Sequence, residues 1–229
     1  MDTYRKRIVD TMLLHKLEAM GGVLIEGPKE CGKTTTALQI ARSTLFLLDP
    51  ATTEQNLMMA KILPSHSLKG ATPRLIDEWQ SAPQLWNGVR FEIDMRSSSS
   101  QFILTGSSVP AADMSLSHTG TGRITRMRMR PMSLFESGDS DGSVSLKELF
   151  SSQPNIAATS DLDITRIAFL ICRGGWPKAI GQPEKIVLQQ AKDYYDAIVE
   201  SDISRPDGIS RNPPTSAKSD EVLCAIHCY

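Results

Sequence analysis

The sequence predicts an α/β fold with a mostly parallel sheet, and two observations support this. Four short apolar runs are bounded by turn residues and separated by helix-length stretches: VLIE (23–26), LFLL (45–48), RLID (74–77) and FILT (102–105). Such runs are typical of buried parallel strands. In addition, the segment GPKECGKTT (27–35) lies directly between the first run and a helix-compatible segment, so it forms part of a strand, loop and helix unit.

A helix is predicted before the first strand and an edge strand after the fourth. Between residues 5 and 20, apolar residues recur at steps of three and four, the period of an amphipathic helix. From 126 to 130, arginines alternate with methionines, so a strand would bury the methionines and expose the arginines. We interpret most of these arginines as belonging to a solvated or edge strand blunted by charge; an anion or nucleic-acid contact is the alternative.

The composition changes after residue 136. The segment 137–145 (SGDSDGSVS) consists of small and acidic residues with one valine, as expected of a linker. We therefore expect a core at 1–136, a linker at 137–145 and a small helical appendage at 146–205. After Arg205 the chain turns to Pro, Ser, Asn and Gly, which predicts a poorly ordered tail at 206–229.

Charge and hydropathy restrict the possible partners. The 25 basic and 26 acidic side chains give a net charge of -1, which does not support DNA binding through a whole-molecule field. The longest apolar runs fall far short of the roughly 18 residues that cross a bilayer. The charged N-terminus MDTYRKRIVD lacks the apolar centre of a secretory signal, so we expect no membrane contact and a cytoplasmic location.

The segment 27–35 carries the pattern G-x-x-x-x-G-K-[ST]. Glycines let such a loop curl so that backbone N–H groups converge on a phosphate, and the following helix N-terminus adds partial positive charge. Lys33 would then reach the β and γ phosphates, and the Thr34 hydroxyl would join a magnesium shell. An ordinary strand-to-helix turn with a capping threonine is the alternative. The predicted phosphate-binding residues are Gly27, Pro28, Lys29, Glu30, Cys31, Gly32, Lys33, Thr34 and Thr35.

Polar residues also end the third and fourth runs. Asp77 ends the third run and Glu78 follows it directly, so both lie at the carboxyl end of a strand, where open α/β sheets bind ligands. We predict that Asp77 holds magnesium, through water, and that Glu78 polarises an attacking water. Thr105 ends the fourth run and Ser107 comes two residues later. Both are candidates to sense the γ-phosphate or orient that water, although such residues are also common turn formers.

Four segments, in this order, carry a family resemblance: GPKECGKTTTA, RLIDEWQSAP, FILTGSS and GTGRITRMRMRPMSLFESG. They resemble bacterial and archaeal AAA-type ATPases in which the ATPase half precedes a domain of unknown function. RGGWPKAI and YYDAIVESDISRPDGISR are similar to the opening of that second domain, so the match covers roughly residues 4 to 208. Members of the family are usually longer, and the resemblance is lost after about Arg211, so we expect the second domain to be incomplete.

The resemblance implies a P-loop NTPase three-layer sandwich with an AAA-like sheet of order 5-1-4-3-2. It also implies ATP and Mg²⁺ as ligands, with Walker A and Walker B motifs at 27–35 and at Asp77 and Glu78. A polar sensor would stand at Thr105 or Ser107. Arg123 would act as an arginine finger or phosphate contact, a role that in AAA-like proteins often needs a neighbouring subunit, here in a homo-oligomer or with a protein partner.

Four functions follow as hypotheses. The first is an ATPase in which water attacks the γ-phosphate and hydrolysis drives a conformational switch. The second is a nucleotide-binding module without turnover unless a partner or the missing half is present. The third is a P-loop kinase for a small molecule, which usually lacks the Asp-Glu ending. The fourth is direct DNA binding through Arg126, Arg128 and Arg130, which the net charge does not support.

Overall fold

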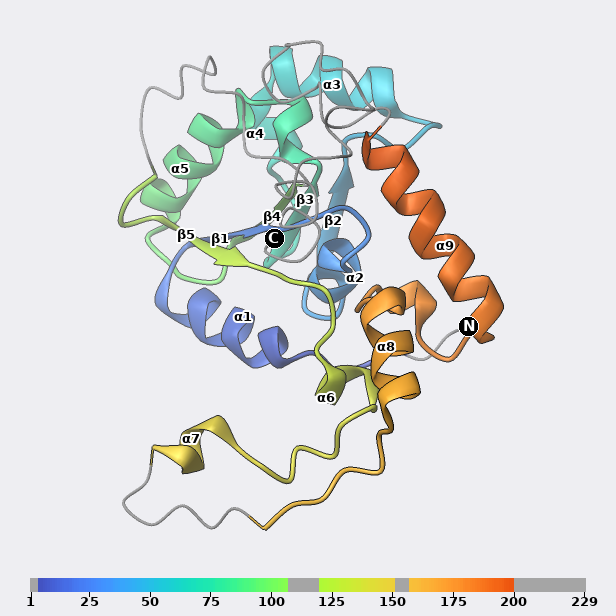
Figure 1. Ribbon diagram of the computed structural model, residues 1–229. Helices are drawn as coiled ribbons and strands as arrows, with labels where there is room; N and C mark the ends of the chain where they lie inside the picture. The colour runs from blue at the N-terminus through green and yellow to red at the C-terminus, as the bar shows by residue number, and fades with distance from the viewer. Residues whose placement is uncertain (1–3, 107–119, 151–156, 200–229) are drawn as a thin grey trace.

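The computed structural model describes residues 4–106, 120–150 and 157–199. Within these residues the centre of the molecule is a five-stranded sheet with strand order β2-β3-β4-β1-β5, and every neighbouring pair is parallel (Figure 1). The predicted order 5-1-4-3-2 is the same sheet counted from its other edge, so the predicted fold class is confirmed. The strands are β1 (Gly22–Glu26), β2 (Ser43–Phe46), β3 (Arg74–Asp77), β4 (Phe102–Gly106) and β5 (Ile124–Arg128).

One strand is shifted from its predicted position. The apolar run 45–48 predicted the second strand, but β2 begins at Ser43 and ends at Phe46, in register with Arg74–Asp77 of β3. Leu48 is half exposed after the strand ends. Hydrogen bonding to β3 therefore sets the bounds of β2, and hydropathy alone does not.

Helices connect the strands and continue the chain after β5. Two longer helices, α1 and α5, flank the sheet, and two more, α8 and α9, follow it. The bounds are α1 (Ile8–Ala19), α2 (Lys33–Leu38), α3 (Thr53–Ile62), α4 (Pro64–Ser67), η1 (Trp79–Ser81), α5 (Leu85–Arg96), α6 (Leu134–Ser137), α7 (Leu146–Leu149), α8 (Ile164–Arg173), η2 (Pro177–Ala179) and α9 (Glu184–Ala197).

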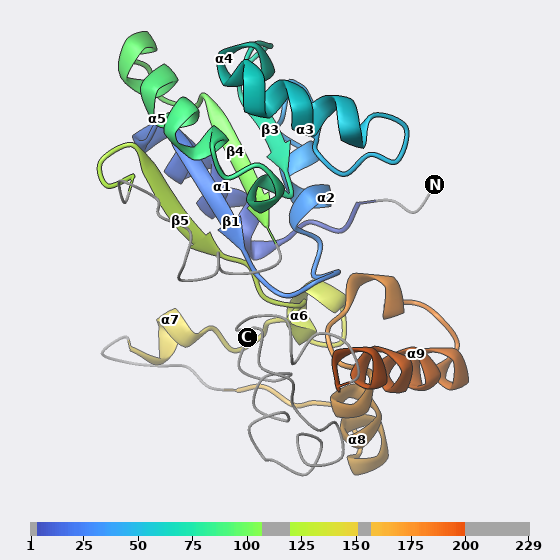
Figure 2. The same cartoon turned by 90° about the horizontal axis from the view of Figure 1, so that it is seen from above.

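The sheet separates two apolar cores, because successive side chains of a strand point to opposite faces. In β1, Val23 and Ile25 pack on the face covered by α1 and α2, whereas Leu24 packs on the face covered by α3, α4 and α5. Figure 2 shows these helices on the two sides of the sheet. On the second face Trp79 and Trp86 are almost fully buried, with ring centroids 5.0 Å apart. The arrangement is the predicted three-layer sandwich.

The edge strand β5 has the alternation that the sequence predicted. Met127 and Met129 are buried, whereas Arg126 and Arg128 are exposed. In the described part of the sheet, β5 pairs with β1 alone, so the exposed arginines lie along an edge. Charge at this position opposes pairing with the edge of another sheet.

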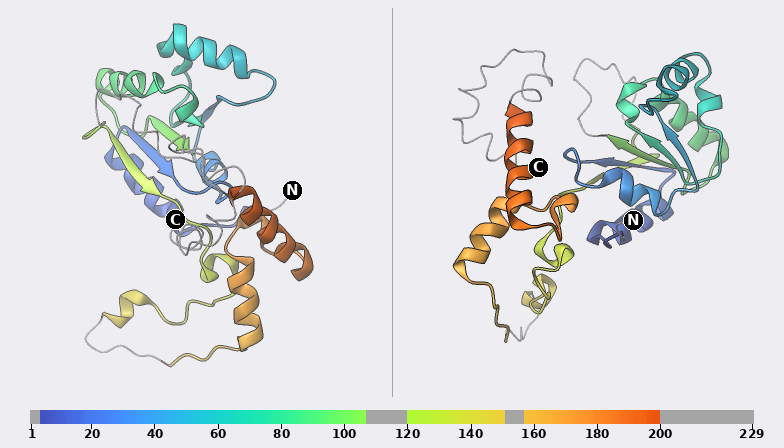
Figure 3. Two further views of the ribbon diagram at one scale, coloured as in Figure 1. Left: turned by 45° about the horizontal axis from the view of Figure 1, so that its top comes forward. Right: turned by 90° about the vertical axis from the view of Figure 1, so that its right-hand side faces the viewer.

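The part that follows the sheet, which we call the helical unit (residues 157–199), lies to one side of it (Figure 3). Before it, α6 is followed by Gly138, which caps the helix with a φ of 82°, in the left-handed region. None of the residues of α7, the next helix, is buried. The helical unit contacts the core through the segment after β5, where the Met132 N–H donates to the Gly175 carbonyl (2.7 Å). The helical appendage was predicted at 146–205. Its residues 151–156 and 200–205, and the predicted tail at 206–229, lie outside the described residues.

Among the helices that the structure describes, none combines the length and hydropathy that a bilayer crossing requires.

Candidate functional site

The loop between β1 and α2 is shaped by its glycines. A Cβ on Gly27 would lie 2.1 Å from the Met129 carbonyl oxygen, so a larger residue would push the loop away from β5. Gly32 has a φ of 101°, a left-handed conformation that side chains disfavour, and α2 begins at the next residue. Glu30 also has a positive φ, of 61°. The loop therefore folds back on itself directly before a helix N-terminus.

Lys33 is buried, with 6% of its surface exposed, and it turns back onto the loop. Its Nζ donates to the carbonyl oxygens of Gly27 (2.9 Å) and Pro28 (2.7 Å). Burial lowers the pKa of Lys33, and the nearby Cys31, Glu78 and Asp77 oppose that shift. The ammonium group thus lies within the curl of the loop, close to two carboxylates.

Three polar side chains from separate elements meet beside the loop. The Asp77 carboxylate at the end of β3 accepts hydrogen bonds through Oδ1 from the hydroxyl of Thr34 on α2 (2.6 Å) and from that of Thr105 on β4 (2.5 Å). A hydroxyl and a carboxylate are the hard oxygen ligands that Mg²⁺ prefers. The pair Thr34 and Asp77 therefore fits a magnesium ion, whereas the described residues contain no cluster of three or more His, Cys, Asp or Glu that could hold a metal.

Glu78 follows Asp77 in a left-handed conformation, with a φ of 56°, and η1 begins at Trp79. Its Oε2 accepts a hydrogen bond from the side-chain amide of Gln80. The backbone turn directs two consecutive carboxylates differently, because Asp77 bonds to Thr34 and Thr105 while Glu78 bonds to Gln80. The two residues therefore have separate surroundings and can have separate roles.

The comparison with protein families gives a match to the AAA domain model over residues 21–137. This match spans more than half of the chain and includes the loop, β3 and β4. The chain belongs to the AAA domain family. AAA domains are P-loop ATPases that as a rule bind ATP with Mg²⁺. The predicted family is confirmed at this level, and the second domain of the resemblance remains a prediction.

The other comparisons add little. No curated protein matches this AAA domain chain. Among solved structures it is similar to the structure of C. elegans PCH-2, with 14% sequence identity and a TM-score of 0.35. The alignment covers 96% of this chain and 65% of that one, so the chain spans less than two thirds of the structure that it matches. At this TM-score we draw no conclusion from the similarity.

One predicted site residue of the AAA domain, Arg123, lies away from the loop. Arg123 precedes β5 and its carbonyl accepts from the Gly22 N–H at the start of β1 (3.0 Å), so it lies at the amino end of the strands. Its Nε donates to both carboxylate oxygens of Asp94 on α5 (2.7 and 2.8 Å). A five-residue strand, at about 3.3 Å per residue, separates this end from the loop of the same chain. Ser107 lies outside the described residues.

Arg7 and Glu136 were not identified from the sequence, although both contribute to the site. Arg7 is buried, and its guanidinium donates to Glu136 Oε1 (3.0 Å) and to the Cys31 carbonyl of the loop (2.9 Å). The segment from Ser133 to Glu136 has the S-x-x-E pattern of a helix capping box, a signal that could have located Glu136. No local pattern identifies Arg7, because its partners are 24 or more residues away along the chain.

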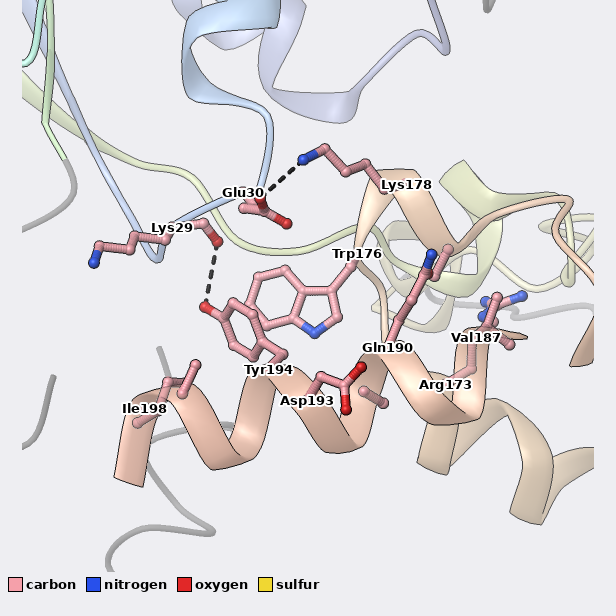
Figure 4. Close-up of a pocket in the computed structure, with 13 residues that line it drawn as sticks. Lys29, Glu30, Arg173, Trp176, Lys178, Val187, Gln190, Asp193, Tyr194 and Ile198 are labelled. Atoms are coloured by element: carbon pink, nitrogen blue, oxygen red, sulfur yellow. Dashed lines mark hydrogen bonds and ion pairs between the residues drawn. The ribbon is translucent and has the colours of Figure 1, made fainter. Parts of the chain in front are cut away.

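The helical unit contacts two exposed residues of the loop, Lys29 and Glu30 (Figure 4). Lys178 Nζ pairs with Glu30 Oε1 (2.8 Å), and the Tyr194 hydroxyl donates to the Lys29 carbonyl (3.3 Å). Tyr194 also packs against Trp176, with ring centroids 4.5 Å apart. These residues line a pocket of about 630 Å³ between the loop and α9. No pattern in the sequence indicated these contacts.

Proposed function

We propose that this chain binds ATP with Mg²⁺ in the loop Gly27–Thr35 and hydrolyses it. One observation carries the proposal: the Thr34 hydroxyl, the Asp77 carboxylate and the Thr105 hydroxyl are joined by hydrogen bonds beside the buried Lys33. Lys33 offers a cation for phosphate oxygens, and Thr34 and Asp77 offer oxygen ligands for a metal. Thr105 adds a polar contact from β4.

The loop residues would bind the phosphates. The backbone N–H groups of the loop and the start of α2 supply donors and partial positive charge. Lys33 would exchange its hydrogen bonds with the Gly27 and Pro28 carbonyls for bonds to β and γ phosphate oxygens. A phosphate oxygen is the better partner, because it carries negative charge that attracts the ammonium, whereas a carbonyl oxygen carries only a partial charge.

Thr34 and Asp77 would hold Mg²⁺, the former directly and the latter through water. A magnesium ion held by these two residues would supply positive charge that offsets the negative charge developing on the phosphate oxygens. In this proposal Thr105 keeps the Asp77 carboxylate oriented, since its hydroxyl already donates to Oδ1. Ser107 would act as the sensor of the γ-phosphate.

Glu78 would act as the general base. It accepts a proton from water while the water oxygen bonds to the γ-phosphorus and the bond from that phosphorus to the β,γ-bridging oxygen breaks, giving ADP and inorganic phosphate. Its hydrogen bond to Gln80 supports this role, because an amide donor can orient a carboxylate without protonating it.

Hydrolysis would be coupled to the helical unit. The contacts of Lys178 with Glu30 and of Tyr194 with Lys29 join α9 and η2 to the loop that would close on the phosphates. Loss of the γ-phosphate would change the loop and therefore bias the position of the helical unit. The division into a core (1–136), a linker (137–145) and an appendage (146–205) is part of this proposal.

A nucleotide-binding module without turnover is the second candidate, and the location of Arg123 favours it. Because Arg123 lies at the end of the sheet opposite the loop, it can supply an arginine finger only to a neighbouring subunit. In that case hydrolysis requires a homo-oligomer or a protein partner, and the isolated chain binds ATP without releasing phosphate.

Phosphate release from ATP and Mg²⁺, measured beside a nucleotide titration, tests the proposal. Release that Lys33→Ala abolishes and Glu78→Gln reduces at least about a hundredfold, with ATP binding retained in Glu78→Gln, supports it. Binding without release identifies the second candidate. Absence of binding in the unaltered chain, or unchanged release from Glu78→Gln, contradicts the proposal or the role of Glu78.

A further inference from the structure

Arg7, immediately before α1, is buried although the proposed reaction does not use it. Only 4% of its surface is exposed, and its guanidinium joins three separate segments. Nε donates to Glu136 of α6 (3.0 Å), Nη1 to the Cys31 carbonyl of the loop (2.9 Å) and Nη2 to the Arg130 carbonyl after β5 (2.8 Å). A planar fork of donors suits such a junction, which the point charge of a lysine could not reproduce.

The bond to Cys31 has a geometric consequence for the loop. The peptide between Cys31 and Gly32 is planar and trans, so its C=O and its N–H point in opposite directions. Because the Cys31 carbonyl points toward Arg7, the Gly32 N–H points away from Arg7. Gly32 itself lies against Arg7, since a Cβ there would be in ordinary contact, 3.4 Å from Arg7 Nη1 and 3.5 Å from Met129 Cε.

Glu136 in turn fixes Arg7. Its side chain is 6% exposed, and Oε1 accepts from both Arg7 Nε (3.0 Å) and the Ile8 N–H (2.8 Å). Burial alone would raise the pKa of Glu136, but the hydrogen bonds from Ser133, Ile8 and Arg7 hold it below its ordinary value. The carboxylate is therefore charged near neutral pH, and the guanidinium has a compensating partner.

We propose that Arg7 is a positioning residue of the phosphate-binding loop: by holding the Cys31 carbonyl it aims the Gly32 N–H at the nucleotide phosphates. The proposal rests on the proposed nucleotide site and deepens it, because it identifies a residue outside the loop motif that makes the loop competent to bind. Arg7 touches no reacting atom, so its effect is on nucleotide affinity.

Arg7 could matter in two ways that do not involve positioning of the loop. Its positive charge could attract phosphates at a distance, in which case lysine would replace it. Alternatively, its hydrogen bonds could stabilise the fold alone, in which case loss of Arg7 would reduce the fraction of folded molecules and leave the affinity of the folded ones unchanged. The experiment has to separate these cases.

The test compares Arg7→Lys with Arg74→Lys in the whole chain. Arg74, at the start of β3, also donates to a backbone carbonyl (Ser67, 3.1 Å) and to a side chain (Ser43 Oγ, 3.0 Å), but it lies at the end of the sheet opposite the loop. Binding of ADP and of ATP with Mg²⁺ is titrated for both variants and the unaltered chain, and thermal unfolding is recorded for each.

Positioning predicts that Arg7→Lys weakens binding of both nucleotides at least about tenfold, as expected when hydrogen bonds to a charged group are lost. If the chain hydrolyses ATP, kcat of Arg7→Lys at saturating ATP should change less than about threefold. An interaction that stabilises the ground state and the transition state equally affects KM and leaves kcat unchanged when it is lost. Arg74→Lys is expected to lower thermal stability and leave both dissociation constants unchanged.

Equal affinity of Arg7→Lys and the unaltered chain overturns the positioning proposal while leaving the proposed function intact. Equal loss of affinity in both variants also overturns it, because the effect is then one of general stability. If the unaltered chain binds neither nucleotide, the proposed function fails and the positioning proposal fails with it.

Discussion

The sheet core and the helical unit are held together by different forces. On each side of the sheet, apolar side chains from several elements form a continuous buried cluster, with Trp86 and Phe102 on one side and Leu13 and Ile103 on the other. In the helical unit only a few apolar residues, such as Leu170 and Val187, are buried among those that the structure describes. Its junction with the rest combines the packing of Trp176 against one core cluster with ion pairs, in which Arg166 and Arg173 both pair with Asp139.

This difference indicates which part can move. Apolar burial is non-directional and changes little with pH or salt, so the core should behave as one rigid body. A few directed ion pairs and hydrogen bonds can be exchanged for others at small net cost. The helical unit can therefore change position over a core that stays intact, and the following predictions test this comparison.

The largest effect is expected from a cavity in the core. Trp86→Ala removes a side chain that is 1% exposed and packs against Trp79, and it should reduce the free energy of unfolding by about 3–5 kcal/mol. Denaturant unfolding measures the change. Phe91→Ala, on the same helix but 61% exposed, is the control and should stay close to the unaltered chain. Similar values for the two variants would contradict the assignment of the core.

A smaller and local effect is expected where the helical unit joins the core. Arg173→Met leaves the Asp139 carboxylate without the Nη2 donor at 2.8 Å, and loss of one partner of a buried pair costs about 3 kcal/mol. Amide hydrogen exchange should accelerate in α8 and α9 and stay unchanged in β1 and β4. The control, Arg166→Met, removes a side chain that is 39% exposed, together with its pairs to Asp139 and Glu184, and should have less effect. Acceleration in β1 would contradict independent behaviour of the two parts.

Acid should loosen the helical unit before the core. Burial tends to raise the pKa of Asp139, but hydrogen bonds from Ser137 and Arg173 and the charge of Arg173 hold it below its ordinary value. A carboxyl whose folded-state pKa is depressed contributes stability above its ordinary pKa of about 3.9, and that stability is lost as the pH falls through the lower folded value.

Hydrogen exchange at pH 6 and pH 3, corrected for the intrinsic rate, should therefore show opening of α8 ahead of β4. Asp139→Asn, which has no carboxyl to protonate, is expected to remove much of the acid dependence of α8. An unchanged acid profile in that variant would show that other carboxyl groups set it.

The smallest effect is expected at the contact between the loop and the helical unit. Lys178 and Glu30 form an ion pair whose side chains are 74% and 50% exposed, and pairs of this kind contribute at most about 1 kcal/mol. Lys178→Ala should therefore change the midpoint of thermal unfolding little, and 0.5 M salt should abolish the difference that remains. A large, salt-independent loss would mean that the contact is structural.

Much of the fold and of the site was predictable, for identifiable reasons. Parallel strands end at one edge of a sheet, so the ends of the runs at 26, 77 and 105 had to converge, and Thr34, Asp77 and Thr105 do meet there. The alternation of arginine and methionine indicated the exposed edge at β5. The sheet order, by contrast, came from family resemblance, since local patterns carry no information on which strands are neighbours.

The remaining features depend on long-range contacts that a local pattern cannot encode. Arg7 is joined to residues 24, 123 and 129 positions away, and Tyr194 to one 165 positions away. Arg123 is a different case: a residue immediately before a parallel strand lies at the amino end, away from ligands bound at the carboxyl ends. The sequence position of Arg123 already contained that information.

The backbone of Glu30 has one more consequence. A residue with a side chain at a φ of 61° is strained by about 1 kcal/mol or more, whereas glycine adopts this conformation freely. At this point of the loop the chain has glutamate, where glycine would be free of strain, and the Glu30 carboxylate forms an ion pair with Lys178 of the helical unit. Glycine at position 30 would relieve the loop of that strain and, in the same step, remove its ion pair with the helical unit, leaving the Tyr194 hydrogen bond to Lys29.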